Sequence, residues 1–239
     1  MRVWLTVFSA LILGMVCGAG EAVSAGDTTT PIASPVESIE NIRAVLKYLW
    51  PVLSPTGKAG RIYYQAICPP NGNDYPLMFP KIDARPPSVA GTELANIRSV
   101  FLHAKSVSVT AEDNSGLFRV RIGKIPDTIL QTRIATLSFD ADSQYNYLSA
   151  IGAIESAPEV QSAMATIGVD VPARVYHYGL VQPTAGLPHL PAQIADVTMD
   201  QALDMVARTW GGVVFYGACT VPGTYEIFFA DGYSLDSRF

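Results

Sequence analysis

The sequence predicts an α+β protein made of small stacked modules, each a helix with antiparallel strands. A helical pattern followed by strand material occurs three times, near 34–68, 92–123 and 198–230. This repetition favours separate modules over one parallel sheet. The composition, 49% hydrophobic and 15% charged, supplies enough apolar side chains for a packed core.

The N-terminus has the pattern of a secretory signal peptide over residues 1–25. A basic residue precedes an apolar stretch from Val3 to Val16, and small residues follow up to Ala25. The apolar stretch is shorter than the ~20 residues that a membrane-spanning helix needs, so we expect cleavage after Ala25. A retained N-terminal anchor and a lipid anchor on Cys17 are the alternatives. The prediction is export to the periplasm or out of the cell, with no membrane span in the mature protein.

Export leaves two cysteines in the mature chain, Cys68 and Cys219. Each ends an apolar, aromatic stretch that follows a helical pattern. Disulfides persist in oxidising compartments, so we predict a Cys68–Cys219 bond if the two strands lie near each other. The alternative is a pair of buried free thiols.

The mature chain begins with a flexible leader, 26–33, and a helix-strand segment, 34–90. Ser34 and Glu37 have the spacing of a capping box at the start of a helix, and Pro51 is expected to end it. A strand leads to Cys68, and a long irregular Pro-rich loop completes the segment.

A central α+β module is predicted over 91–189. Its helix begins near Thr92, and an alternating hairpin with a turn at 112–116 follows. Further patterns predict two more strands, 129–139 and 171–181, and two helices, 143–154 and 158–167.

The C-terminal module, 190–239, is predicted to have the order β-α-β-β. A short strand, 194–197, precedes a capping box formed by Thr198 and Gln201. The helix has an apolar stripe of Ala202, Leu203, Val206 and Trp210, and Gly211-Gly212 ends it. Two strands follow, 213–218 and 224–230.

The segment 190–229 resembles the short N-terminal domain shared by secretins and TonB-dependent receptors. The resemblance rests on the run from Ile194 to Ala207 and on the Gly-Gly-strand sequence from Gly211 to Tyr216. It implies a β-α-β-β module that mediates protein contacts in a bacterial envelope of the Gram-negative type. It implies no catalytic residues, because that domain has none.

The charge balance argues against general nucleic-acid binding. The formal net charge is −5, whereas phosphate recognition needs a basic face. The densest basic group is Arg119, Arg121 and Lys124, whose alternation predicts one solvated face of a sheet.

We predict no catalytic, cofactor-binding or metal-binding residues. Asp140 begins a run like a calcium loop, but Tyr145 and Ile151 replace the Gly and the acidic residue that such a loop needs, so a helix start capped by Asp142 or Ser143 is favoured. The histidines His103, His177 and His189 lack zinc-site spacing. Glu155 and Glu159 are interpreted as helix-end residues, not as a catalytic pair.

Tyrosine is the candidate residue type for an interaction surface. Strand side chains alternate, so one of each neighbouring pair is expected to face outward, and exposed tyrosine suits interfaces. The candidate surface comprises Tyr63, Tyr64, Tyr176, Tyr178, Tyr216 and Tyr225. The alternative is that these tyrosines fill thin two-layer cores.

Together these observations favour a non-enzymatic exported protein that binds an envelope protein through sheet edges or tyrosines, with strand addition as the mode. We expect no cofactor. The alternatives are an exported hydrolase and an exported small-ligand binder, each with a site assembled from dispersed residues. A pocket that holds His177 or His189 beside a carboxylate would favour the enzyme.

Overall fold

A mixed five-stranded sheet forms the centre of the fold. A computed structural model of the chain describes residues 35–53, 57–68, 77–88, 91–111, 116–168, 186–219 and 225–230. The strand order is β2-β3-β1-β6-β7. The strands are β1 (Ala59–Gln65), β2 (Val107–Ala111), β3 (Leu117–Ile122), β6 (Val213–Ala218) and β7 (Tyr225–Ala230).

The central strand, β1, is parallel to both of its neighbours. Ile62 lies opposite Val120 of β3 and Phe215 of β6. The outer strands β2 and β7 each form an antiparallel hairpin with the strand beside them. All of β1 is buried except Gln65, which is half-buried, because layers cover both faces of the sheet there.

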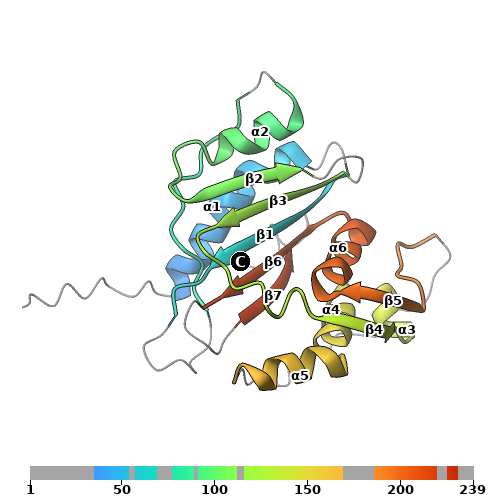
Figure 1. The fold of residues 1–239 in the computed structure, drawn as a ribbon. Helices are drawn as coiled ribbons and strands as arrows, with labels where there is room; N and C mark the ends of the chain where they lie inside the picture. The colour runs from blue at the N-terminus through green and yellow to red at the C-terminus, as the bar shows by residue number, and fades with distance from the viewer. Residues whose placement is uncertain are drawn as a thin grey trace, which may run out of the picture. The chain divides into compact units, whose positions relative to one another are not determined.

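Two helices cover one face of the sheet, α1 (Pro35–Leu53) and α2 (Glu93–Val100) (Figure 1). They bury an apolar cluster against alternate side chains of β1, β3 and β6. Thr92 caps α2 by accepting a hydrogen bond from the backbone N–H of Ala95, which agrees with the predicted start of that helix.

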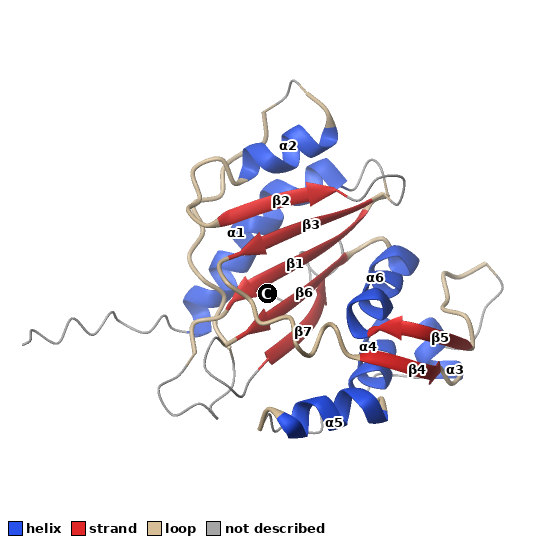
Figure 2. Cartoon of the chain, viewed as in Figure 1, coloured by secondary structure: helices blue, strands red, loops and turns tan. Residues whose placement is uncertain are grey.

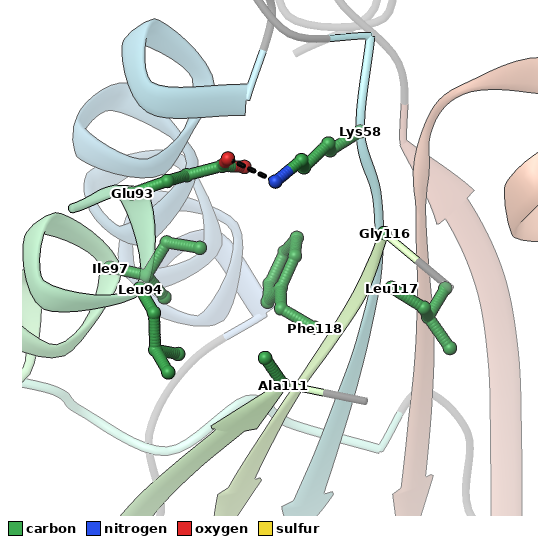
Figure 3. A pocket seen from close by; sticks show the side chains of 8 residues that line it. All are labelled: Lys58, Glu93, Leu94, Ile97, Ala111, Gly116, Leu117 and Phe118. Atoms are coloured by element: carbon green, nitrogen blue, oxygen red, sulfur yellow. Dashed lines mark ion pairs between the residues drawn. The ribbon is translucent and has the colours of Figure 1, made fainter. Parts of the chain in front are cut away.

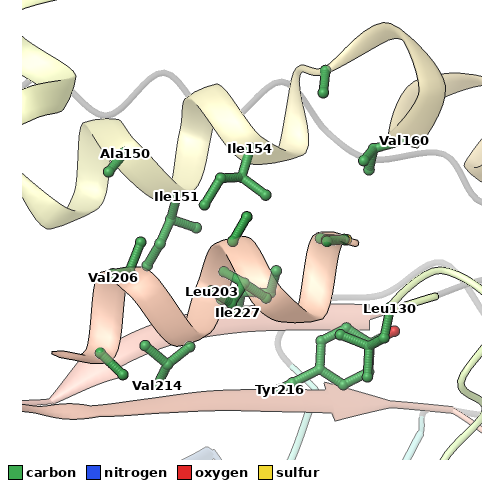
Figure 4. Packing of buried hydrophobic residues seen from close by; sticks show 14 of the residues in the cluster. Leu130, Ala150, Ile151, Ile154, Val160, Leu203, Val206, Val214, Tyr216 and Ile227 are labelled. Carbon is green, nitrogen blue, oxygen red and sulfur yellow. The ribbon is translucent and has the colours of Figure 1, made fainter. Parts of the chain in front are cut away.

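The second face of the sheet packs against α6 (Met199–Trp210), which lies between the strands and α4 (Tyr147–Glu155). Figure 4 shows Leu203 and Val206 of α6 between the side chains of α4 and Val214 of β6. The remaining elements of this layer are α3 (Ala141–Tyr145), α5 (Pro158–Thr166) and a two-stranded antiparallel sheet of β4 (Arg133–Ser138) and β5 (Gln193–Thr198).

Helix α6 has the ends that its sequence predicts. The Thr198 hydroxyl accepts from the Gln201 N–H, and the Gln201 side chain accepts from the Thr198 N–H. Gly211 ends the helix with a φ of 65°, a left-handed conformation that glycine adopts without strain. Leu203 and Val206 are fully buried, and Trp210 is half-buried against the same cluster.

The α+β class and the order β5-α6-β6-β7 are confirmed. The expected stacking of separate antiparallel modules differs from the observed arrangement, because the sheet takes strands from all three predicted segments. Residues 32–239 form one compact unit. The first strand of the C-terminal segment, β5, pairs with β4 of the central segment. Strand β1 lies between β3 and β6, so its pairing joins the first predicted segment to the other two.

Some predicted boundaries are also corrected. Helix α1 continues past Pro51 to Leu53, because the buried Leu53 side chain packs in the core beyond the proline. The residues before Arg133 form a turn, so β4 is shorter than the predicted strand. The predicted signal peptide, leader, Ser34 cap and strand 171–181 lie outside the described residues.

Gly60 of β1 is required by a close approach of the Phe118 ring. A Cβ at this position would lie 1.9 Å from the Phe118 Cζ atom. We expect Gly60→Ala to lower the free energy of unfolding by about 1–3 kcal/mol, measured by urea denaturation. Adding Phe118→Leu should relieve part of that loss. Additive effects of the two substitutions would contradict this explanation.

Candidate functional site

A cluster of charged side chains lies between the sheet and α6. We define the arginine-aspartate cluster as Arg61 and Tyr63 of β1, Arg119 and Arg121 of β3, and Asp200 and Asp204 of α6. The strand register places Arg61 opposite Arg119 and Tyr63 opposite Arg121, so all four side chains share the face that α6 packs on. On α6, Asp200 and Asp204 are four residues apart and therefore share one helix face.

Arg61 is the innermost member and has no solvent exposure. Its Nη1 donates to Asp204 Oδ1 and to the backbone oxygen of Asp200, each at 2.9 Å. Its Nη2 forms an ion pair with Asp200 Oδ1 at 3.0 Å that lacks hydrogen-bond geometry. Its Nε has no hydrogen-bond partner among the described residues.

Tyr63 connects the two strands to the helix. Its hydroxyl donates to Asp200 Oδ1 at 2.8 Å and accepts from Arg119 Nε at 3.1 Å. Arg119 also pairs with Asp204 Oδ2 at 2.5 Å. The guanidinium groups of Arg61 and Arg121 lie 4.9 and 4.7 Å from the centre of the Tyr63 ring, within the range of cation–π contacts.

The environment keeps Tyr63 protonated. Burial is the largest cause and raises the pKa of Tyr63 to about 12, although Arg61 opposes the rise. Burial likewise raises the pKa of Asp204, opposed by Arg61 and Arg119. At neutral pH, Tyr63 therefore acts as a neutral hydrogen-bond donor. Hydrogen bonds and ion pairs among the members of the cluster join α6 to β1 and β3.

This shift predicts a loss of stability at high pH. The folded pKa of Tyr63 is above the unfolded value of 10.0, so its contribution is fully present below pH 10 and is lost as the pH rises toward 12. The loss is about 2–3 kcal/mol. Burial raises the pKa of Tyr216 in the same direction. In urea denaturation between pH 9 and 12, Tyr63→Phe should therefore reduce the decline in the free energy of unfolding only in part, because Tyr216 still contributes to it. An unchanged decline would contradict the shift.

Four of the six candidate tyrosines belong to the core. Tyr63, Tyr64, Tyr216 and Tyr225 are at most 3% exposed, so they form no exposed interaction surface. Both faces of these strands are covered, and the side chains of the candidate pairs are therefore buried on either side. Tyr176 and Tyr178 lie outside the described residues.

The predicted Cys68–Cys219 disulfide is present, with 5.9 Å between the two Cα atoms. Its cysteines follow the ends of β1 and β6, two neighbouring parallel strands. A disulfide of this kind is typical of proteins in oxidising compartments.

The remaining sequence candidates have local roles. Asp140, not Asp142 or Ser143, caps α3 by accepting from the Ser143 N–H. His103 is exposed, and His189 stacks on Tyr145. Glu159 accepts from the Ala135 N–H of β4. In the described part of the chain, no three His, Cys, Asp or Glu side chains are grouped to hold a metal ion. His177 lies outside that part.

Strand β2 presents outward-facing backbone groups at one edge of the sheet. Gly123 N–H donates to the Ser106 oxygen, so in the alternating antiparallel ladder Val107, Val109 and Ala111 direct their N–H and C=O groups away from β3. One of these groups has a side-chain partner, because Arg98 Nε donates to the Val109 oxygen at 3.3 Å. The opposite edge strand, β7, is largely buried, whereas β2 is exposed or half-buried along its length.

Comparisons of this chain with family models, with curated proteins and with solved structures find no match. Within the described residues, none of the helices combines the length and the apolarity that crossing a membrane requires.

Proposed function

We propose that this chain is a non-enzymatic, exported protein-interaction module of the bacterial envelope, and that it binds its partner by strand addition to β2. The outward row of backbone groups on β2 is the observation that carries this proposal. Strand addition uses such a row for main-chain hydrogen bonds and neighbouring side chains for specificity.

The composition of β2 supports the proposal. Natural edge strands are usually protected by charged residues, proline or a bulge. The strand Val107–Ala111 has neither proline nor a charged residue, and its register with β3 is continuous. Among the described residues, Arg98, an exposed side chain from α2, donates a hydrogen bond to this edge, and a flexible side chain can be displaced by a backbone donor.

The surroundings of β2 also suit a protein partner. Ser108 and Thr110 are exposed on the face of the sheet that α6 covers farther along, and Figure 2 shows no described helix over β2 and β3 on that face. Arg121 lies on the same face in the neighbouring strand, and arginine is enriched in interfaces. The disulfide, the predicted signal peptide and the resemblance of 190–229 to an envelope module support the location.

The test is capture of partners from envelope extract by the mature protein, followed by a matched pair of variants. Ala111→Pro removes an outward N–H donor without removing a ladder bond to β3, and it should abolish capture of a specific envelope protein. Ser108→Ala changes only a side chain of β2 and should retain the partner. Equal capture by both variants would contradict strand addition. No partner together with turnover in a hydrolase screen would favour the exported-enzyme alternative.

A further inference from the structure

Strand β2 lies at the outer edge of the five-stranded sheet, beyond β3 (Figure 1). Its outward-facing N–H and C=O groups belong to alternate residues, Val107, Val109 and Ala111. Val109 is the middle residue of the strand and of this row of backbone groups. The row is therefore symmetric about Val109, so it can be matched by a copy of itself.

The two-stranded sheet of β4 and β5 has protective features that β2 lacks. In β4, the Ala135 N–H donates to the Glu159 side chain of α5 at 3.0 Å. In β5, Asp196 has a φ of 57°, and its side chain pairs with Arg133 of β4. Charged side chains and local irregularities protect natural edge strands from pairing with other chains. Strand β2 has no charged residue, and its register with β3 is continuous, so it remains open to pairing.

An antiparallel copy of β2 matches the outward-facing backbone groups in one register. A two-fold axis through Val109 places Val109 opposite its own counterpart and Val107 opposite Ala111 of the second copy. All three are outward-facing residues, so each of these pairs exchanges N–H···O bonds in both directions. The Val109 oxygen also accepts from Arg98 Nε at 3.3 Å, and a carbonyl oxygen has two lone pairs for two donors.

The side chains of β2 suit this register on both faces of the strand. Val107 and Val109 pack against the apolar cluster beneath α1 and α2, and Figure 3 shows the Ala111 side chain on the side of α2. The pairing therefore adds valine–valine and valine–alanine contacts at the border of that cluster. On the other face, the exposed Ser108 lies opposite Thr110 of the second copy, a cross-strand pair that forms hydrogen bonds. No like charges oppose each other within the paired strands.

We propose that in the free protein the β2 edge is covered by β2 of a second copy, in an antiparallel pairing about Val109. This inference rests on the proposed function, because it concerns the same edge, and it adds regulation: the envelope partner has to displace the second copy. One pair of five-residue strands buries less than the roughly 1,200–2,000 Å² of a stable complex. The dimer is therefore weak and reversible.

The experiment is sedimentation velocity of the mature, disulfide-bonded chain at concentrations from about 1 μM to about 1 mM. A monomer–dimer equilibrium is expected, with no larger species, because a two-fold pairing uses the β2 edge of both chains. Ala111→Pro removes one hydrogen bond between the chains at each end of the pairing. It should weaken association about tenfold or more.

Two double variants test the register through exposed side chains. Ser108→Glu/Thr110→Glu places like charges opposite each other in both cross-chain pairs and should weaken association about tenfold. Within one chain these positions lie beside Arg121 and Arg119 of β3, so the added carboxylates do not disfavour the fold. Ser108→Glu/Thr110→Lys places opposite charges in both cross-chain pairs and should associate at least as tightly as the wild type. The two variants differ only in the charge at position 110.

The proposal is overturned if the mature chain remains monomeric over the whole range, if Ala111→Pro dimerises like the wild type, or if the two double variants associate equally. Circular dichroism of each variant reports whether it is folded. Capture of an envelope protein by a chain that stays monomeric would overturn this inference and keep the proposed function. A dimer with the expected response to the variants, but without capture from envelope extract, would overturn the proposed function alone.

Discussion

Removal of the Cys68–Cys219 disulfide is expected to lower the free energy of unfolding by about 4–5 kcal/mol. The bond joins residues 151 apart in sequence, so it restricts a large part of the unfolded chain. In the chain-entropy model this restriction is the main source of stabilisation, and it increases slowly with loop length.

The measurement is urea denaturation of the double variant Cys68→Ala/Cys219→Ala beside the wild type. Each single variant should lose about as much stability as the double variant, because either substitution opens the loop. The denaturant dependence should become steeper, since an open unfolded chain exposes more surface. Thiol labelling of both cysteines in denatured, unreduced protein would contradict the bond itself.

Asp204→Ala is expected to lower the free energy of unfolding by about 3–5 kcal/mol. Asp204 is the partner that Arg61 and Arg119 share, and Arg61 has no contact with solvent. Removal of Asp204 leaves the buried Arg61 guanidinium with Asp200 as its one acidic partner among the described residues. The loss reflects mainly that uncompensated charge, not the net value of the ion pair.

A matched control is available on the same face of the sheet. Asp127 pairs with Arg121 at 3.0 Å, but both side chains are more than one third exposed. Asp127→Asn should therefore change the free energy of unfolding by less than about 1 kcal/mol. Equal effects of Asp127→Asn and Asp204→Ala would mean that solvent screens the arginine-aspartate cluster. Urea denaturation at neutral pH distinguishes the two outcomes.

The parts of the fold that depend on residues close together in sequence were predictable from the sequence. The hairpin of β2 and β3 has clear alternation and a polar turn, and its register is set within a few residues. Helix α6 has its capping box, its apolar stripe and its terminal glycine in one short segment. Each of these signals lies within one continuous segment of the chain, so a sequence pattern suffices to detect it.

The pairing of β1 was not predictable in the same way. Its two partners are set by contacts between residues far apart, such as Gly60 with Val213, and no local pattern specifies that choice. For this reason the expectation that one of the two tyrosines of β1 faces outward is wrong. A strand has an exposed face only if one side of it is uncovered.

The sequence does contain a signal for the arginine-aspartate cluster. Arg61 is the one charged residue in the strand Ala59–Gln65, all of which is buried except the last residue. Asp204 lies among the buried positions of α6. A charged residue within each of two buried patterns indicates a buried pair. Because Asp204 reaches across to β3, Arg119 is largely buried in an ion pair, whereas alternation alone predicted a solvated side chain.

The parallel pairing of β1 with β6 has a consequence for how the chain reaches its native state. Residues 59–65 emerge early during synthesis, but one of their two neighbours forms only when residues 213–218 have appeared. Pairings between such distant segments slow folding, and the unpaired strand remains able to associate with other chains during the delay. A nascent chain of this topology therefore has to be kept from aggregating until its last third is available.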